Sequence, residues 1–333
     1  MRTCRWLANP AAALLLLLPA FAQSPTVFKV GVNLVHAVAT VKDKNGQLVG
    51  TLEKGDFEVY DNGAKQEIAL FEHHTDQPLS VALQIDTSGS TAKELKYESD
   101  ASSRFARALL GEGNLEDALS LYTFNWQVRQ EMRFSRDLKM LDARLKLLRG
   151  EAGTALYDAL VFGARDLEPR EGRKAIVVVT DGGNTVSKYT IDDALEAAHL
   201  ADAVIYSVVV VPITNEVGRN IGGEHALQIL AERTGGKIFF PAAGPELDRV
   251  FTEIIRELRT QYLIGFYPKG VPLNKNRFHK LEIRATRPDL RVSARNGYFG
   301  EAEGGAVGSA EDRISVRPER QKPQPPPVTR PKK

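Results

Sequence analysis

The stretch from Val81 to Ser90 constrains the fold of this chain most strongly. Five mostly apolar residues, Val81 to Ile85, lead directly into Asp86-Thr-Ser88-Gly-Ser90, a dense group of oxygen-bearing side chains. A continuous apolar run that ends in turn residues indicates a strand buried on both faces, as in parallel sheets. Its carboxyl end, where the three polar residues follow, is where α/β sheets bind their ligands.

One carboxylate and two hydroxyls at alternate positions, Asp86, Ser88 and Ser90, suit a hard divalent cation. Mg²⁺ and Mn²⁺ prefer oxygen ligands, and Mg²⁺ keeps several of its water molecules. The alternative interpretation is that the two serines cap a following helix. Thr91 and Glu94 have the spacing of a capping box, which predicts a helix over about residues 93–110. This stretch alone leaves both interpretations open.

A second apolar strand ends in an acid at Ala175-Ile-Val-Val-Val-Thr180-Asp181-Gly182. A doubly wound sheet opens a crevice where its strand order reverses, and the strands that end in Asp86 and Asp181 are the natural candidates for that position. Thr154 lies in a glycine-bearing loop before a predicted helix and can reach the same crevice. Such a gathering of two carboxylates and three hydroxyls from three loops favours a cation site over helix caps.

The chain around these strands alternates between strand and helix patterns, which predicts a doubly wound, mostly parallel six-stranded sheet with helices on both faces. The strands are expected over residues 81–86, 117–124, 128–134, 175–181, 204–211 and 237–240. The helices are expected over residues 93–110, 137–148, from about 155 to before Pro169, 191–201, 224–234 and 246–262.

Strand patterns flank this α/β region on both sides. Residues 28–74 alternate in polarity and carry two Asn-Gly pairs, Asn45-Gly46 and Asn62-Gly63, which predict hairpins with type I′ turns. Further strands are expected over residues 262–267, 280–285 and 292–298. Because neither set of strands forms a stable sheet alone, we expect residues 23–76 and 263–300 to pair into one small β-sandwich, with residues 77–262 inserted.

The N-terminus has the pattern of a secretory signal peptide over residues 1–22. Arg2 and Arg5 precede an apolar run from Ala11 to Pro19, and Ala20-Phe21-Ala22 has the form of a cleavage site. The pattern predicts an exported protein that begins near Gln23 and is periplasmic, attached to the cell surface or secreted. No later stretch has the apolar length of a transmembrane helix.

The charge balance argues against nucleic-acid binding. The whole chain has 44 basic and 42 acidic residues, and removal of the two leader arginines makes the mature protein formally neutral. Its single cysteine, Cys4, is removed with the leader, so the mature chain contains no disulfide. Residues 301–333 are rich in Gly, Ser, Pro and charge, which predicts a disordered tail. Its basic end is either a contact for anionic surface polymer or lipid, or a solvated segment without a partner.

Three segments of this chain resemble the metal-ion-dependent adhesion site of von Willebrand factor type A domains. They are Asp86-Thr-Ser88-Gly-Ser90, Gly153-Thr154-Ala-Leu-Tyr-Asp158 and Val179-Thr-Asp181-Gly182, and the resemblance covers about residues 78–262. The flanking strands are similar to those of bacterial, acidobacterial-type proteins related to this family, on Asp56-Phe-Glu-Val and Gly297-Tyr-Phe.

The resemblance implies a Mg²⁺ site, with Mn²⁺ or Ca²⁺ as alternative ions. Ser88, Ser90 and Thr154 would bind the ion through their hydroxyls, directly or through water, and Asp86 and Asp181 would orient it mostly from one water away. Because the hydroxyl ligands are neutral, the ion would keep positive charge and accept a carboxylate from a partner protein. The resemblance therefore implies a non-enzymatic module for adhesion or complex assembly.

Residues around the predicted site have expected roles of their own. Asp158, one helical turn after Thr154, is predicted to support the site loops through hydrogen bonds. Specificity for the partner is expected from a rim formed by Asn125, Trp126, Gly183 and Asn184.

Two other functions remain open from the sequence. One is a hydrolase that uses the same ion as a Lewis acid, although none of the three segments contains a histidine to act as general base. The other is a structural scaffold whose metal site is vestigial.

Overall fold

The structure, a computed structural model, describes residues 34–73, 77–92, 94–111, 113–210, 220–241, 245–271 and 278–300. The predicted signal peptide at residues 1–22 and the predicted tail at residues 301–333 lie outside the described residues. Within the described part of the chain, no helix is both long enough and apolar enough to cross a membrane.

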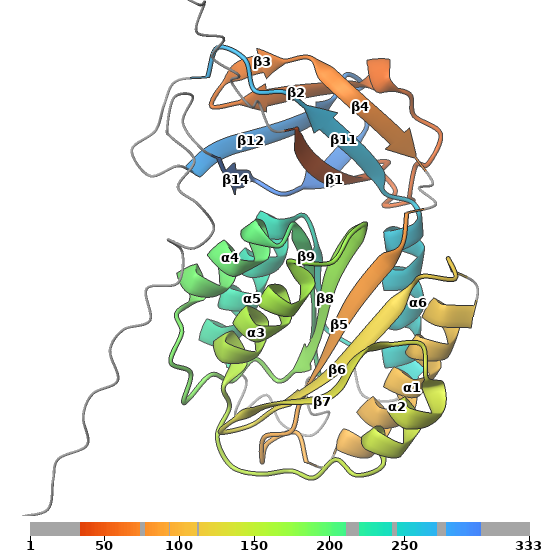
Figure 1. The fold of residues 1–333 in the computed structure, drawn as a ribbon, viewed down its shortest axis with the longest axis vertical. Helices are drawn as coiled ribbons and strands as arrows, with labels where there is room; N and C mark the ends of the chain where they lie inside the picture. The colour runs from red at the N-terminus through yellow and green to blue at the C-terminus, as the bar shows by residue number, and fades with distance from the viewer. Residues whose placement is uncertain are drawn as a thin grey trace, which may run out of the picture. The chain divides into compact units, whose positions relative to one another are not determined.

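A six-stranded sheet forms the centre of the α/β domain, in the order β10-β9-β8-β5-β6-β7 (Figure 1). Its neighbouring strands are parallel except for β7, which returns antiparallel to β6 after a short loop. The strands are β5 (Leu79–Asp86), β6 (Ala118–Phe124), β7 (Val128–Ser135), β8 (Arg173–Thr180), β9 (Ala203–Val209) and β10 (Lys237–Phe239). The predicted mostly parallel sheet is confirmed.

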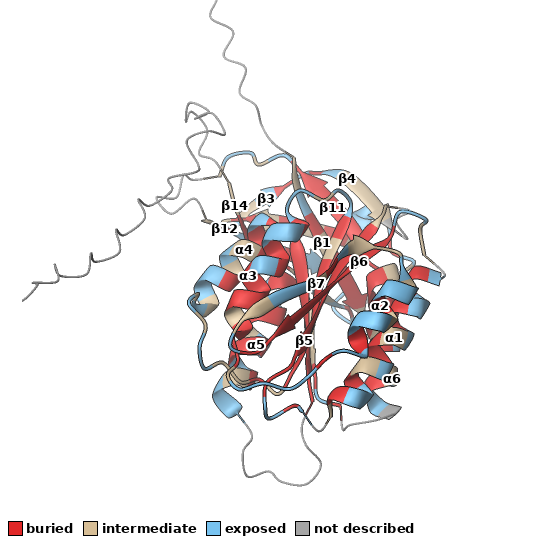
Figure 2. Cartoon of the chain, turned by 60° about the horizontal axis from the view of Figure 1, so that its bottom comes forward, coloured by how far each residue is buried: buried red, intermediate tan, exposed pale blue. Residues whose placement is uncertain are grey.

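Helices cover both faces of this sheet because its central strands are apolar on both sides. Every residue of β5, β6 and β9 is buried. Figure 2 shows β5 and β6 as buried strands between helices with exposed outer faces. One face packs against α1 (Leu95–Gly111), α2 (Leu138–Leu145) and α6 (Pro245–Arg259). The other packs against α3 (Leu156–Leu167), α4 (Ile191–Leu200) and α5 (Ile221–Thr234).

The order of the strands reverses beside β5, as the sequence predicts. Strand β5 pairs in parallel with β6 on one side and with β8 on the other. The segments that follow β5 and β8 therefore emerge side by side at the carboxyl edge of the sheet, where a crevice opens in folds of this type.

The flanking strands form a β-sandwich in which N-terminal and C-terminal strands share each sheet, which confirms the predicted fold class. One sheet has the order β13-β1-β11-β4 and the other β14-β12-β2-β3, and apolar side chains of both form one core. The first contains β1 (Val35–Lys42), β4 (Ile68–His73), β11 (Tyr262–Phe266) and β13 (Arg291–Ala294). The second contains β2 (Phe57–Asp61), β3 (Ala64–Gln66), β12 (Phe278–Ala285) and β14 (Gly297–Phe299), with a short helix η1 (Lys54–Asp56) before β2.

The two Asn-Gly pairs adopt different turns. Asn62 and Gly63 have φ angles of 47° and 84°, so the hairpin between β2 and β3 has the predicted type I′ geometry. At the other pair only Gly46 has a positive φ, and the prediction of a type I′ turn is wrong there. The cause is Asp43, whose carboxylate accepts the N–H groups of Asn45 and Gln47 and so selects another turn.

The expected strand over residues 292–298 is divided into β13 and β14, which belong to different sheets. Arg295 stands at the division and is buried, with its guanidinium bonded to Asp202 and to the carbonyl of His36. The N–H of Asn296 donates to the carbonyl of Arg233 at 3.0 Å. The chain leaves the first sheet here, where Arg295 also bonds to Asp202 and Asn296 bonds to Arg233, both in the α/β domain.

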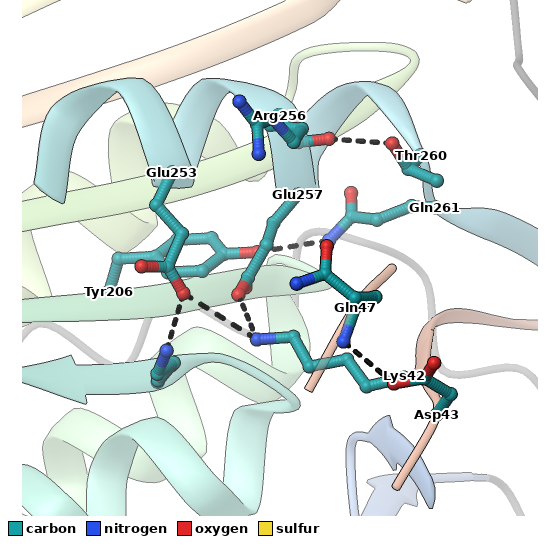
Figure 3. A network of polar contacts seen from close by, with 10 residues as sticks. Lys42, Asp43, Gln47, Tyr206, Glu253, Arg256, Glu257, Thr260 and Gln261 are labelled. Carbon is teal, nitrogen blue, oxygen red and sulfur yellow. Dashed lines mark hydrogen bonds and ion pairs between the residues drawn. The ribbon is translucent and has the colours of Figure 1, made fainter. Parts of the chain in front are cut away.

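A charged network joins the sandwich to the last helix of the α/β domain (Figure 3). The Nζ of Lys42, at the end of β1, lies 2.5 Å from Oε1 of Glu257 and 3.7 Å from Oε1 of Glu253 on α6. Lys237 of β10 lies 2.5 Å from the same oxygen of Glu253. The Glu257 side chain is almost fully buried, so its pair with Lys42 is an internal contact, while Glu253 and Lys237 lie at the surface.

Candidate functional site

The candidate site occupies the carboxyl edge of the central sheet, at the end of the molecule away from the sandwich (Figure 1). Three loops meet there: the loops that follow β5 and β8, and the loop that precedes α3. Each carries one of the three segments that the sequence singles out.

Asp86 ends β5 and is fully buried. One carboxylate oxygen accepts the N–H of Ser88 at 2.8 Å, and the other accepts the hydroxyl of Thr180 at 2.6 Å. Burial raises the pKa of Asp86 to about 6, and the charge of Asp181 raises it further, against the hydrogen bonds from Thr180 and Ser88. A cation beside this carboxylate would offset the cost of burying its charge.

The two serines lie in the loop after Asp86, with their hydroxyl oxygens 3.0 Å apart. Ser88 is buried and Ser90 is exposed. Helix α1 begins only at Leu95, so these serines do not cap it. The alternative interpretation of the serines as helix caps is therefore wrong. The predicted capping box is also wrong, because the Thr91 hydroxyl donates to the carbonyls of Asp86 and Ser88 and closes the loop.

The loop before α3 is hydrogen-bonded to both other loops. On one side Glu151 forms a parallel bridge with Ser88, and its N–H donates to the carbonyl of Thr87 at 2.9 Å. On the other side the N–H of Thr154 donates to the hydroxyl of Thr185, and the Thr185 N–H donates back to the Thr154 carbonyl, both at 2.9 Å. Backbone bonds thus fix the three loops relative to one another.

The oxygen atoms of Asp181 and Thr154 face a common space beside Gly183. A Cβ atom on Gly183 would lie 3.1 Å from Oδ1 of Asp181 and 3.5 Å from Oγ1 of Thr154. The N–H of Gly183 also donates to that Asp181 oxygen at 2.9 Å. Because Gly183 has no side chain, there is room between the Asp181 carboxylate and the Thr154 hydroxyl at the edge of the site.

The five candidate residues offer two carboxylates and three hydroxyls, a donor set that suits Mg²⁺ or Mn²⁺. In the part of the chain that the structure describes, no three His, Cys, Asp or Glu side chains form a group that could hold a metal ion. The candidate set has only two such side chains, Asp86 and Asp181, and depends on the hydroxyls of Ser88, Ser90 and Thr154 for the remainder. Together with the unneutralised buried charge of Asp86, this composition fits a hard cation.

Asp158 is buried near the start of α3 and bonds to the loop that follows Asp181. Its Oδ1 accepts the N–H of Lys188 at 2.7 Å and the N–H of Tyr189 at 3.0 Å. These two hydrogen bonds hold the chain downstream of Asp181.

The predicted rim is partly corrected. Asn125 is buried, and its side chain bonds to the Thr87 hydroxyl and to the N–H of Gln127, so it positions a loop and does not face a partner. Trp126 is 58% exposed, and its indole N–H donates to Glu151 at 2.9 Å. Gly183 and Asn184 are half-buried.

Glu98 on α1 is a buried acid near the site that the sequence analysis did not single out. It is 1% exposed, and neither carboxylate oxygen has a hydrogen-bond partner among the described residues. Burial raises the pKa of Glu98 well above its usual value, and the charges of Asp86, Glu94 and Asp181 add to the shift. The signal for it was available, because Glu98 falls in the same helical stripe as the apolar Phe105 and Leu109.

Comparison with known proteins gives the family. The sequence profile of the von Willebrand factor type A domain matches residues 80–253. The chain belongs to the von Willebrand factor type A domain family. The matched type A domain contains all five candidate ligands and ends within α6, so the sandwich strands lie outside it. No curated protein matches the chain.

Solved structures similar to the chain include other type A domains. The vWF domain of the type V pili tip protein Mfa5 from Porphyromonas gingivalis is 13% identical with a TM-score of 0.46, covering 55% of this chain and 96% of that one. The conserved hypothetical protein BatB from Bacteroides thetaiotaomicron is 20% identical with a TM-score of 0.44, covering 54% and 97%. A von Willebrand factor type A protein from Catenulispora acidiphila is 12% identical with a TM-score of 0.46, covering 80% and 70%.

Proposed function

We propose that the type A domain binds a protein partner through a divalent cation, Mg²⁺ in the first place, at the carboxyl edge of its sheet. Ser88, Ser90 and Thr154 would hold the ion with their hydroxyls, and Asp86 and Asp181 would orient it. One observation carries this proposal: hydrogen bonds join the loop before α3 to the loops after β5 and β8, and each of the three loops provides candidate oxygen ligands. When bound, the ion supplies positive charge that a carboxylate of the partner can neutralise.

Exposed apolar side chains beside the site suit a protein partner. Trp126, Val186 and Ile221 are 58%, 45% and 74% exposed. The N–H of Val186 donates to the Thr154 carbonyl at 3.2 Å, and Trp126 lies against Gly153, where an added Cβ would be 3.0 Å from the Trp126 Cβ. Aromatic and aliphatic anchors of this kind carry much of the binding energy in protein interfaces. The partner sequence would therefore place an acidic residue next to apolar ones.

A binding function accounts for the site better than hydrolysis does. No histidine occurs among the candidate ligands, and Asp86 is fully buried with both carboxylate oxygens engaged by Ser88 and Thr180. A general base must instead reach the proton that it removes from water or substrate. We infer that the domain is not an enzyme, and that it acts outside the cytoplasm, because residues 1–22 have the signal-peptide pattern.

Selection from a random peptide library tests the proposal. The chain from Gln23 onward would be immobilised with Mg²⁺, and bound peptides would be eluted with EDTA. We expect eluted peptides to contain Asp or Glu beside Leu, Phe or Trp, and to lose binding when that acid becomes Asn or Gln.

The same selection is repeated with two variants. The test variant is Asp86→Ala, Ser88→Ala, and the control is Asp192→Ala, which changes an exposed acid on α4. The double variant should yield no EDTA-eluted peptides, and Asp192→Ala should behave as wild type. Peptides that bind equally well in EDTA would contradict a cation-dependent function.

A further inference from the structure

A cavity of about 820 Å³ lies at the opposite edge of the central sheet from the candidate cation site. Its walls include Arg173 and Lys174 at the start of β8 and Ala203 at the start of β9. The sandwich contributes His36 of β1 and Leu263 of β11. Both domains therefore line the cavity. Ligand pockets are common at such domain junctions, and the volume of this cavity is typical of them.

The wall of this cavity has more basic than acidic side chains. Its basic residues are Arg170, Arg173, Lys174 and Arg295, in addition to the histidines His36 and His199. Its acids are Glu116, Glu171 and Asp202. Asp202 is paired with Arg295, and the two glutamates are exposed to solvent, where their charge is screened. The wall therefore carries an excess of positive charge, with Arg170 and Lys174 half-buried.

Two of these cations bond to neutral oxygens. The Nε of Arg170 donates to the hydroxyl of Ser80 at 2.7 Å, and the Nζ of Lys174 donates to the carbonyl of Glu168 at 3.0 Å. Among the described residues, neither side chain forms an ion pair with a carboxylate. Burial lowers the pKa of Lys174, against the charges of Asp202 and Glu168, as expected for an ammonium group that lacks a close counter-ion.

Two buried nitrogen atoms of residues in the wall also lack hydrogen-bond partners within the described chain. They are Nε of Arg295 and Nδ1 of His199, in residues that are 8% and 3% exposed. The other ring nitrogen of His199 bonds to the carbonyl of Arg233 at 3.1 Å. Burial lowers the pKa of His199, so its ring is neutral, donates from Nε2 and keeps Nδ1 as an acceptor. The Nε–H of Arg295 is therefore the group of the two that a bound group with acceptor oxygens would partner.

From these observations we infer that the cavity binds a small oxyanion, a phosphate or a di-carboxylate, between the type A domain and the sandwich. Arg170 and Lys174 supply the charge, and Arg295 supplies a further N–H donor. This binding site is independent of the cation site, because it lies at the other edge of the sheet and uses other residues. An anion held there contacts both domains and stabilises their contact.

Thermal unfolding and calorimetry of the chain from Gln23 onward test this inference, with inorganic phosphate and succinate as separate probes. The measurements are made in EDTA, so that the cation site does not contribute, and against NaCl at matched ionic strength. The test variant is Arg170→Gln, Lys174→Gln, and the control is Lys188→Gln, an exposed lysine at the opposite edge.

We expect saturable binding of one or both probes, with a rise in melting temperature that NaCl does not produce. The double variant should bind about a hundredfold more weakly or worse, because it loses two charge-assisted hydrogen bonds to the anion. Lys188→Gln should match wild type, and the probe that binds more tightly distinguishes a phosphate from a carboxylate ligand. A response of the double variant equal to that of wild type, or no response to either probe beyond NaCl, would overturn the inference.

Discussion

The chemistry of the candidate site depends on single residues whose surroundings are unusual. Asp86 is a fully buried acid held by Ser88 and Thr180, and its pKa is raised to about 6 by burial. Near neutral pH Asp86 is negatively charged, and the hydrogen bonds from Ser88 and Thr180 stabilise that charge only in part. A divalent cation would complete that stabilisation, which is why this residue, more than the exposed Ser90, decides the character of the site.

Trp126 offers a direct report on cation binding. The chain has two tryptophans, and the other, Trp6, lies in the predicted signal peptide, so the chain from Gln23 contains Trp126 alone. Because Trp126 lies against Gly153, next to Thr154, and bonds to Glu151, ordering of that loop by an ion should change its fluorescence. We predict a saturable change in emission on titration with Mg²⁺.

The control for this titration is the Asp86→Ala, Ser88→Ala variant, which keeps Trp126 and should show no change. If its emission responds to Mg²⁺ as wild type does, the signal does not come from the proposed site.

At the scale of elements, α1 combines an amphipathic helix with an acid on its buried face. The raised pKa of Glu98 means that the folded chain retains a proton that the unfolded chain releases above about pH 4.5. Stability in EDTA should therefore fall as pH rises above that value, by up to about 1.4 kcal/mol per pH unit, until the folded pKa is passed. We predict that Glu98→Gln removes this loss and is more stable than wild type at pH 8.

Chemical unfolding at several pH values from 4.5 to 8, in EDTA, measures this effect. Glu196→Gln, on the exposed face of α4, is the matched control and should leave the pH dependence unchanged. A difference between Glu98→Gln and wild type that is constant over the whole range would show that the side chain is not held in its protonated form.

Most of the elements could be predicted from the sequence because local patterns determine them. The apolar runs of β5 and β8 are buried on both faces, and a strand with that pattern has few alternatives to the centre of a parallel sheet. The start of α1 could not be predicted in this way, because Thr91 donates to two carbonyls of its own loop instead of capping the helix.

The remaining errors arise where distant groups decide local structure. The break between β13 and β14 depends on Arg295 and its partners Asp202 and His36, which lie far from it in sequence. Asn125 is predicted in the partner-contact rim, but its hydrogen bonds to the Thr87 hydroxyl and from the Gln127 N–H keep it buried.

At the scale of the whole molecule, the sandwich and the type A domain meet through charged contacts at the edge away from the cation site. The network of Lys42, Glu253 and Glu257 joins β1 to α6 (Figure 3). Because the Glu257 side chain is 4% exposed and that of Lys42 is 22% exposed, removal of the lysine leaves a buried carboxylate with less compensation. We predict that Lys42→Met lowers the free energy of unfolding by about 2–3 kcal/mol.

The control for this change is Lys65→Met, since Lys65 pairs with Glu58 on the surface of the sandwich and its side chain is 61% exposed. Urea unfolding should show little or no cost for this exposed pair, because solvent screens its charges. Equal costs for the two variants would contradict the view that the Lys42–Glu257 pair is an internal contact.

The central claim is that the three loops at the carboxyl edge of the type A domain form a cation site. Calorimetric titration of the chain from Gln23 with Mg²⁺ and with Mn²⁺, beside the Asp86→Ala, Ser88→Ala variant, tests it most directly. The account predicts saturable binding to wild type that the double variant loses while it remains folded by circular dichroism. Equal binding by both proteins would contradict the account and leave the type A domain as a scaffold with a vestigial metal site.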